Sequence, residues 1–327
     1  MIIDTRIDEI KSWLSHLYKT DNFILEPASS DASFRRYYRV TIDNKTMIVM
    51  DAPPKYENVG PFIKIAQFLA KHGLHVPDII AEEREKGFLL LTDLGSQPYL
   101  NKLNAKSADV LYKPAIDALI KIQLCPQQSI TLPEYNRGLL QKELNLFSEW
   151  FLHKHMSLSV PDTIQNQFDI LINHALEQPQ VIVHRDYHSR NLMYSDIRNP
   201  GIIDFQDAVI GPITYDLVSL LRDCYIAWPD DKIEGWVAHY FKLAQDQGLL
   251  SNCSLEKFTR WFDLMGLQRH IKILGVFCRL NYRDKKSNYM HDLPQTLAYV
   301  LKICSIYDEF KDLGDFLSTQ PNIKAIL

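Results

Sequence analysis

The sequence predicts an α+β protein in which a small antiparallel sheet region precedes a larger, mainly helical region. Three observations lead to this class. Short apolar runs separated by polar turns fill the first ninety or so residues, whereas apolar residues at helical spacing dominate from residue 97 onward. One short strand–loop–strand segment, between residues 181 and 205, interrupts the helices. The 327 residues suffice for about two domains.

The composition excludes several classes of protein. With 46% hydrophobic and 23% charged residues, the chain has the composition of a globular protein. Lys and Arg number 36 against 40 Asp and Glu, so no nucleic-acid or membrane partner is expected. The five cysteines are scattered, which favours reduced thiols. No signal peptide or membrane span is apparent, so we expect a cytoplasmic protein, and the sequence identifies no protein partner.

The N-terminal region is predicted to contain a helix, a hairpin, a second helix and two further strands. The helix covers 6–18, the hairpin strands 37–42 and 47–50 flank a polar turn, and the second helix covers 58–71, ending before Gly73. Strands follow at 76–81 and 87–92, and the small polar segment after Pro27 is expected to be a loop. An apolar strand that runs into Asp93-Leu-Gly-Ser marks the boundary: an N-terminal region at 1–92, a hinge at 93–96 and a C-terminal region at 97–327.

The C-terminal region is predicted to be helical except for the segment at 181–205. The expected helices cover 105–124, 137–156, 162–177, 213–226, 232–248, 255–280 and 292–311. The expected strands are 181–184 and 201–205. On the helix at 255–280, Leu267, Ile271 and Leu274 are core positions; the polar residues beside them face either solvent, which is favoured, or an acceptor site.

The segment VIVHRDYHSRNLMYSDIRNPGIIDFQDA has the spacing of a phosphoryl-transfer site. Asp186 lies in the loop, Asn191 follows five residues later and Asp204 ends the second apolar run. Phosphoryl transfer from ATP needs hard oxygen ligands for Mg²⁺ and a carboxylate that orients the acceptor hydroxyl. H-R-D-x-x-x-x-N followed by D-F is the pattern of protein-kinase-like enzymes. Asp186 is therefore the candidate base, and Asn191 and Asp204 are the candidate metal ligands.

Two other interpretations of this segment compete with phosphoryl transfer: turn and capping roles, and zinc binding. Asp and Asn are common turn and capping residues, so any one of these three alone would be unremarkable, whereas their joint spacing favours chemistry. Zinc binding by His184 and His188 would need a helix and the Glu of HExxH, and the segment offers neither. His184 is expected to be a packed loop residue.

These residues resemble the aminoglycoside phosphotransferase and choline kinase superfamily. The resemblance rests on His184-Arg-Asp-Tyr-His-Ser-Arg-Asn and Ile203-Asp-Phe-Gln. Further segments resemble the bacterial N-acetylmuramate/N-acetylglucosamine anomeric kinases: Ser29-Ser-Asp-Ala-Ser-Phe-Arg-Arg-Tyr-Tyr-Arg, Met50-Asp-Ala-Pro-Pro, the stretch from Asp204 to Asp223, and Gln268-Arg-His-Ile-Lys-Ile-Leu-Gly. The resemblance spans roughly residues 28–295. It implies a protein-kinase-like two-lobe fold, with a nucleotide-binding N-terminal lobe and a catalytic C-terminal lobe.

The resemblance also implies where ATP would bind. No GxGxxG is present, so the hydroxyls of Ser30 and Ser33 and the charges of Arg35 and Arg36 are the expected phosphate contacts. The strand at 47–50 lacks the usual lysine and has Met50 and Asp51 at its end; Arg39 or Lys45 is a further substitute, and Glu57 is not assigned as its partner. The backbone of Thr92, Asp93 and Leu94 is expected to hydrogen-bond adenine.

For the acceptor, the resemblance implies a sugar bound by the C-terminal lobe. Its expected contacts are Arg190, Asp207, Arg222 and Arg279, and Asp216 and His184 are expected to support the catalytic loop. The implied activity is ATP- and Mg²⁺-dependent phosphorylation of the anomeric hydroxyl of N-acetylmuramate or N-acetylglucosamine. The alternatives are an aminoglycoside or choline-type kinase and a nucleotide-binding pseudokinase; a protein-substrate kinase is disfavoured because no Ala-Pro-Glu segment is present.

Overall fold

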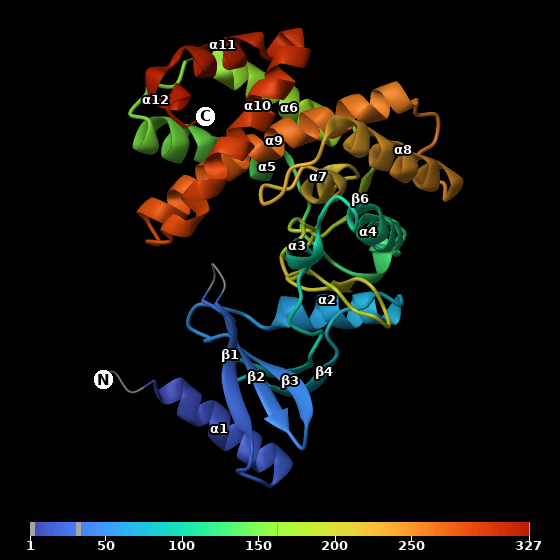
Figure 1. Ribbon diagram of the computed structural model, residues 1–327, viewed down its shortest axis with the longest axis vertical. Helices are drawn as coiled ribbons and strands as arrows, with labels where there is room; N and C mark the ends of the chain where they lie inside the picture. Colours follow the sequence, from blue (N-terminus) through green and yellow to red (C-terminus); the bar gives the residue numbers. More distant parts are fainter. Residues whose placement is uncertain (1–3, 31–33, 162, 327) are drawn as a thin grey trace. The chain divides into compact units, whose positions relative to one another are not determined.

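A computed structural model describes residues 4–30, 34–161 and 163–326. The chain forms two compact units, which are described separately (Figure 1). The first unit comprises residues 1–96 and 201–206, and the second comprises 97–200 and 207–327. No sequence pattern indicated that the short segment 201–206, which contains Asp204, would belong to the first unit. The functional roles given above to the two lobes and the hinge remain predictions.

The first unit is built on a five-stranded antiparallel sheet with the order β1-β2-β3-β5-β4. Its elements are α1 (Thr5–Tyr18), β1 (Ile24–Ser30), β2 (Arg36–Ile42), β3 (Lys45–Asp51), α2 (Gly60–Lys71), β4 (Ile79–Glu83) and β5 (Phe88–Thr92). The predicted antiparallel sheet, the hairpin and both helices are confirmed. The hairpin turn consists of Asp43 and Asn44, both at positive φ (48° and 62°), which matches the right-handed twist of the strands.

Strand β1 corrects the expectation of a loop after Pro27. Residues 24–30 pair with β2, and the register shifts between Pro27 and Ser29. Proline has no N–H to donate, so it is tolerated on an edge strand or at a bulge, and β1 provides both. Strand β4 also begins later than expected, at Ile79.

Helix α1 covers one face of this sheet. Tyr38, Val40 and Ile42 of β2 and Val49 of β3 pack with Ile10 and Leu14 of the helix in one buried cluster. Because side chains alternate across a strand, the other members of β2, Tyr37 and Arg39, belong to the opposite face. Gly87 fixes the start of β5: at φ +72°, a Cβ there would lie 1.9 Å from the carbonyl oxygen of Ala52.

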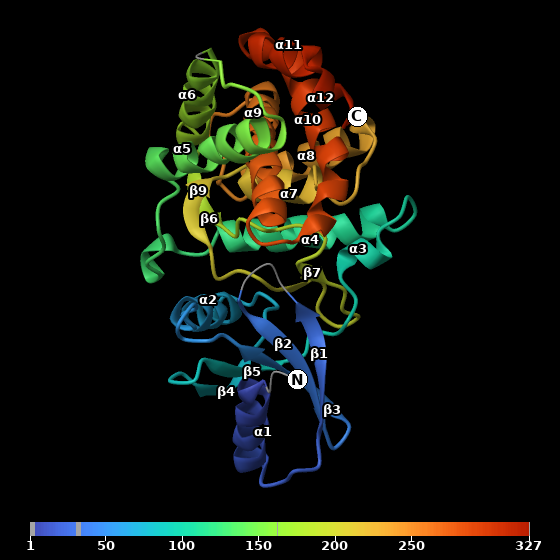
Figure 2. The ribbon, with the colours of Figure 1, turned by 90° about the vertical axis from the view of Figure 1, so that its left-hand side faces the viewer.

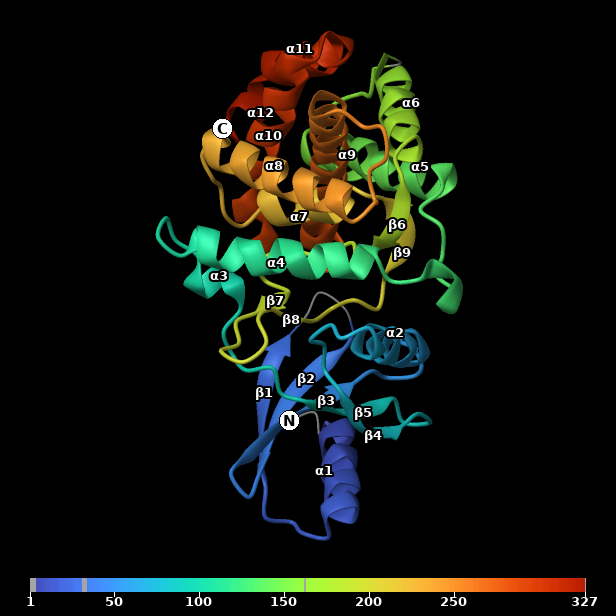
Figure 3. The same ribbon diagram turned by 90° about the vertical axis from the view of Figure 1, so that its right-hand side faces the viewer.

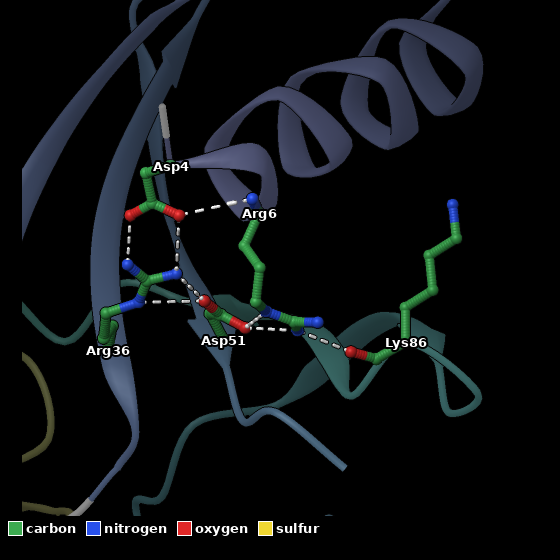
Figure 4. Close-up of polar contacts among 5 residues, drawn as sticks. All are labelled: Asp4, Arg6, Arg36, Asp51 and Lys86. Carbon is green, nitrogen blue, oxygen red and sulfur yellow. Dashed lines mark hydrogen bonds and ion pairs between the residues drawn. The ribbon is translucent and has the colours of Figure 1, made fainter. Parts of the chain in front are cut away.

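Four charged side chains attach the start of α1 to the sheet (Figure 4). Asp51 is fully buried at the end of β3, and its carboxylate accepts from Arg6 Nε at 2.8 Å and from Arg36 Nε at 3.0 Å. Arg36 also pairs with Asp4, and Arg6 donates to the carbonyl oxygen of Lys86 at 2.6 Å. A buried carboxylate is stable only when it is paired and hydrogen-bonded, and here two guanidinium groups provide that.

The second unit is mainly helical, as predicted (Figures 2 and 3). Its α-helices are α3 (Tyr99–Lys102), α4 (Ala108–Gln123), α5 (Arg137–Leu146), α6 (Thr163–Leu176), α7 (Tyr215–Leu221), α8 (Asp230–Asp246), α9 (Leu255–Tyr282), α10 (Leu293–Ile306), α11 (Lys311–Thr319) and α12 (Pro321–Lys324). Helix α5 continues as a π-helix, η2 (Phe147–His155), and short 3₁₀ turns are η1 (Gln127–Ser129), η3 (Ser287–Asp292) and η4 (Asp308–Phe310). Helix α7 is shorter than expected, and α3, α11 and α12 were not predicted.

The strands outside the first sheet are short. They are β6 (Gln180–Val183), β7 (Leu192–Met193), β8 (Gly201–Ile202) and β9 (Val209–Pro212). Strand β6, predicted at 181–184, pairs antiparallel with β9, which the sequence did not indicate. The strand expected at 201–205 is reduced to β8.

Helix α9 is the central helix of the second unit and is buried on nearly all sides. Leu267, Ile271 and Leu274 are core residues, as predicted. The expectation that the polar face beside them is solvated is wrong, because Gln268, Arg269 and His270 are at most 4% exposed. No helix of the described residues is long and apolar enough to cross a membrane.

The Asp51 network yields a stability prediction. Asp51→Asn should lower the free energy of unfolding by about 2–4 kcal/mol, because it removes the shared charge from two guanidinium groups. Urea denaturation measures this change. Arg137→Lys, at an exposed ion pair with Asp169, is the matched control and should change stability by less than about 1 kcal/mol. Equal effects in the two variants would contradict the assigned role.

Candidate active site

Two buried carboxylates hold the loop that carries the HRD-type motif. Asp216, in the first turn of α7, accepts hydrogen bonds from the backbone N–H of His184 at 2.6 Å and of Arg185 at 2.9 Å. Asp223, just beyond the end of α7, accepts from the backbone N–H of Ser189 at 3.0 Å and from its hydroxyl. Both carboxylates are at most 1% exposed. Burial raises the pKa of Asp216 to about 7, although the two N–H donors oppose that rise.

Asp186 lies between these two anchor points with its carboxylate available. Within the described residues, neither of its carboxylate oxygens takes part in a hydrogen bond or ion pair. Burial raises the pKa of Asp186, but the positive charges of Lys272, His188, Arg269 and Arg185 outweigh it, so the pKa lies below its usual value. An ionised carboxylate with unused acceptor positions can orient a hydroxyl group and accept its proton.

The loop geometry around Asp186 is fixed by its own side chains. Asn191 Nδ2 donates to the carbonyl oxygen of Asp186 at 3.0 Å, and His184 Nδ1 accepts from the N–H of Asp186 at 3.2 Å. Arg185 has φ +78°, a strained value for a residue with a side chain. Such strain persists only where the surrounding structure enforces it, and it is concentrated at functional sites. His184 and His188 lie in this loop and not on a helix, which removes the basis for a zinc pair.

A buried ionic cluster, centred on Glu143 of α5, lies beside the loop. Its carboxylate, in a residue 5% exposed, pairs with Arg185 and with Lys272 Nζ at 3.2 Å, and accepts from the hydroxyl of Tyr135. Lys272 also donates to the hydroxyl of Tyr215 at 2.9 Å. Sequence reasoning missed both Glu143 and Lys272. A signal for Lys272 was present, since Gln268, Arg269 and Lys272 form a polar stretch within an otherwise apolar helix.

Asp204, the second predicted metal ligand, belongs to the first unit. Its Oδ1 accepts from Gln206 Nε2 at 2.7 Å, and its φ is +66°. The carboxylate of Asp204 and the amide oxygen of Asn191 are hard donors, as Mg²⁺ requires. The chemistry of this donor set therefore fits the ion.

The predicted phosphate contacts divide between the two faces of the first sheet. Arg36 binds Asp4 and Asp51 on the face that α1 covers, which favours Arg35 over Arg36 as the phosphate contact. Arg39 donates to Asp93 Oδ2 at 2.6 Å and to the carbonyl oxygen of Gly95 at 3.0 Å. Lys45 is exposed at the hairpin turn. Ser30 ends β1, nothing is described of its side chain, and Ser33 lies outside the described residues.

Arg35, the residue before β2, forms an ion pair with Glu57 at 2.8 Å. Their side chains are only 11% and 14% exposed. Glu57 lies three residues before the start of α2. The pair thus joins the segment expected to cover the phosphates to the segment that precedes α2.

The side chains at the expected hinge form hydrogen bonds with nearby residues of the same unit. The carboxylate of Asp93 binds Arg39 and accepts from the N–H of Gly95 at 2.9 Å, and Thr92 Oγ1 accepts from the N–H of Asp78 at 2.9 Å. Burial raises the pKa of Asp93, but the hydrogen bond from Arg39 outweighs it. The N–H of Leu94 has no hydrogen-bond partner among the described residues. Backbone recognition of adenine by Thr92, Asp93 and Leu94 remains a prediction.

The expected acceptor residues differ in their burial and in their partners. Arg190 is exposed, and its guanidinium lies 3.4 Å from the centre of the Tyr225 ring. Arg279 is half-buried on α9, and Asp207 is exposed. Arg222 is 8% exposed and donates to Asp263 at 2.6 Å. Arg222 thus has a partner inside the helical packing, which corrects its expected contact with substrate.

Comparison with known proteins gives concordant matches. Residues 24–250 match the phosphotransferase enzyme family. An N-acetylmuramate/N-acetylglucosamine kinase of Pseudomonas putida is 43% identical, with 96% of each chain covered. A kinase of the same name from Neisseria meningitidis is 38% identical, with 93% of each chain covered.

Solved structures show the same fold at low sequence identity. An ethanolamine kinase of Plasmodium vivax has a TM-score of 0.66 at 13% identity, covering 92% of this chain and 89% of that one. A choline kinase of Streptococcus pneumoniae has a TM-score of 0.65 at 16% identity, covering 91% and 100%. The expected kinase-like fold is thereby confirmed.

The unused acceptor positions of the Asp186 carboxylate lead to a kinetic prediction. Asp186→Asn should lower kcat by about 10²- to 10⁴-fold, because the amide cannot take the proton of the acceptor. Nucleotide affinity, measured by calorimetry, should stay within a few-fold of the wild-type value. Turnover near the wild-type rate would reject Asp186 as the base.

The different partners of Arg35 and Arg36 lead to a second kinetic prediction. Arg35→Gln should raise the KM for ATP about tenfold or more, because a charge-assisted contact with phosphate is lost. Arg36→Gln is the matched comparison and should reduce stability while leaving this KM within about twofold. Steady-state kinetics at saturating acceptor, together with thermal melting, measures both. The opposite pattern would place the phosphate contact on Arg36.

Proposed function

This chain belongs to the phosphotransferase enzyme family, and we propose that it phosphorylates the anomeric hydroxyl of N-acetylmuramate and N-acetylglucosamine, using ATP and Mg²⁺. It is an enzyme that transfers phosphate to an alcohol group. The observation that carries the proposal is the state of the Asp186 carboxylate. Its pKa is lowered, neither of its oxygens has a hydrogen bond among the described residues, and its loop is fixed at both ends by buried carboxylates.

The proposed reaction assigns one step to Asp186. Its carboxylate accepts a hydrogen bond from the anomeric hydroxyl and takes the proton as the oxygen bonds to the γ-phosphorus of ATP. The bond between that phosphorus and the β–γ bridging oxygen breaks, giving ADP and the sugar 1-phosphate. Asp216 and Asp223 act through the loop backbone, which keeps the carboxylate in position during the transfer.

The nucleotide would be held by residues of the first unit. Arg35, oriented by Glu57, supplies positive charge to the phosphates in place of the absent strand lysine. The backbone at 92–94 recognises adenine, and the N–H of Leu94 is available for this. Asn191 and Asp204 would hold Mg²⁺, which when bound neutralises charge on the phosphates.

The choice of acceptor rests on the relatives and on local charge. Relatives at 38–43% identity over nearly their whole length are named as kinases of these two sugars. An aminoglycoside carries several positive charges, and three cations, Arg185, Arg269 and Lys272, act on Asp186 here. Glu143, Asp186 and Asp223 balance these cations, so the surroundings of Asp186 carry no excess charge, which suits a neutral acceptor better than a polycation. Aminoglycoside, ethanolamine and choline kinases match at 13–16% identity, which shows a shared fold and no more.

A pseudokinase remains the alternative of another class. It was suggested by the missing lysine of the strand at 47–50, for which we propose Arg35, paired with Glu57, as the substitute. The retention of Asp186, Asn191 and Asp204 favours an active enzyme.

One assay tests the proposal. Purified protein with MgATP and either sugar should give a sugar 1-phosphate, identified by phosphorus NMR and by its lability in acid. The 1-O-methyl glycoside of N-acetylglucosamine lacks the free anomeric hydroxyl and should not react. Phosphorylation of this glycoside at the same rate would refute the anomeric position, and faster turnover of kanamycin would refute the substrate class.

A further inference from the structure

Arg269 is a buried arginine whose hydrogen-bonding capacity is largely unused. It lies on α9 and is 4% exposed. Its only hydrogen-bond partner among the described residues is Cys224 Sγ, 4.0 Å from Nη1, and its Nε has none. No carboxylate within the described residues forms an ion pair with it. A guanidinium has five N–H donors, and leaving them unsatisfied in a protein interior is unfavourable, so a ligand that supplies acceptors would relieve this.

The position of Arg269 links it to the catalytic loop. Cys224 follows Asp223, whose carboxylate holds Ser189 of that loop. The charge of Arg269 is one of those that lower the pKa of Asp186, and it also acts on His188. The guanidinium therefore lies within electrostatic range of the carboxylate that orients the acceptor hydroxyl.

Arg269 has too few hydrogen-bond acceptors among the described residues, but the charges around it are already balanced. Arg185, Arg269 and Lys272 are three cations, and Glu143, Asp186 and Asp223 are three carboxylates. Asp216 adds a group whose pKa of about 7 leaves it partly ionised near neutral pH. The cluster thus has no excess positive charge, so the unused N–H groups of Arg269 suit a neutral oxygen such as an amide carbonyl.

We propose that Arg269 donates hydrogen bonds to the acetamido carbonyl oxygen of the acceptor sugar and so selects N-acetylated sugars. This inference rests on the proposed function. The acetamido group is attached to the carbon next to the anomeric carbon, whose hydroxyl faces Asp186. N-acetylmuramate and N-acetylglucosamine share it, whereas the lactyl ether of N-acetylmuramate is one ring carbon further away. A donor hydrogen-bonded to Cys224, next to the loop anchor Asp223, is suited to recognise what the two sugars have in common.

Neighbouring cations are less suited to this role. Lys272 donates to Glu143 and Tyr215, and Arg185 pairs with Glu143, so both have partners. Arg222 pairs with Asp263. Of Arg185, Arg222, Arg269 and Lys272, Arg269 is the one without a carboxylate partner among the described residues.

The test compares Arg269→Lys and Arg269→Met with the wild-type enzyme. At saturating ATP, both variants should raise the KM for the two sugars by a similar factor of about ten to a hundred, as for loss of a charge-assisted hydrogen bond. The KM for ATP should change less than about twofold. Thermal melting identifies a variant that does not fold, and Arg137→Lys, at an exposed pair, is the control with unchanged kinetics.

Binding without chemistry separates recognition from catalysis. Calorimetry with the 1-O-methyl glycosides of N-acetylglucosamine and of glucose should show that the wild-type protein prefers the acetamido glycoside and that the folded Arg269 variants lose this preference. An unchanged preference overturns the inference, as does a loss of activity confined to N-acetylmuramate, which would place the lactyl carboxylate on Arg269. Failure of the wild-type enzyme to phosphorylate either sugar would instead refute the proposed function.

Discussion

The hydrogen bonds from the catalytic loop to Asp216 and Asp223, near the two ends of α7, fix the geometry of the candidate site in the second unit. A two-turn helix presents one buried carboxylate near each end, Asp216 and Asp223, and each accepts backbone N–H groups from the loop between β6 and β7. Backbone donors that would otherwise be buried without partners are thereby satisfied, and the loop is fixed at two points on either side of Asp186. This arrangement stabilises the positive φ of Arg185, which few residues adopt. Rigidity is supplied by groups that do not touch the reacting atoms.

Helix α9 supplies the electrostatic part of the same arrangement. Lys272 neutralises Glu143 together with Arg185, and Arg269 adds a charge that helps to keep Asp186 ionised. Such charges are tolerable inside a protein only because each carboxylate has a cation nearby. The close approach of α5 to α9, where a Cβ at Gly275 would lie 2.3 Å from the carbonyl carbon of Leu146, packs the helix that carries Glu143 directly against α9.

The sequence predicted the fold class, the α1 helix, the first hairpin and most of the helices, because apolar periodicity depends on local spacing. It also indicated Asp186, Asn191 and Asp204 as one pattern, and Asp216 separately as a residue that supports the loop. It did not indicate Glu143 or Lys272, since a charged residue that pairs inside the core looks the same in sequence as one on the surface. Pro27 concealed β1, because a proline ordinarily interrupts a strand and only edge placement makes it tolerable.

The three arginines at 35, 36 and 39 show how strand alternation decides roles that composition cannot. Arg36 faces α1 and binds Asp51, whereas Arg39, on the other face, binds Asp93 of the expected hinge. Only Arg35 lies before the strand, where it meets Glu57 near α2. Asp51, at the end of the strand where a kinase lysine would be sought, belongs to the α1 face, so it does not place a negative charge on the opposite face. In the proposed function, Arg35 therefore supplies from the neighbouring segment the positive charge that the strand at 47–50 lacks.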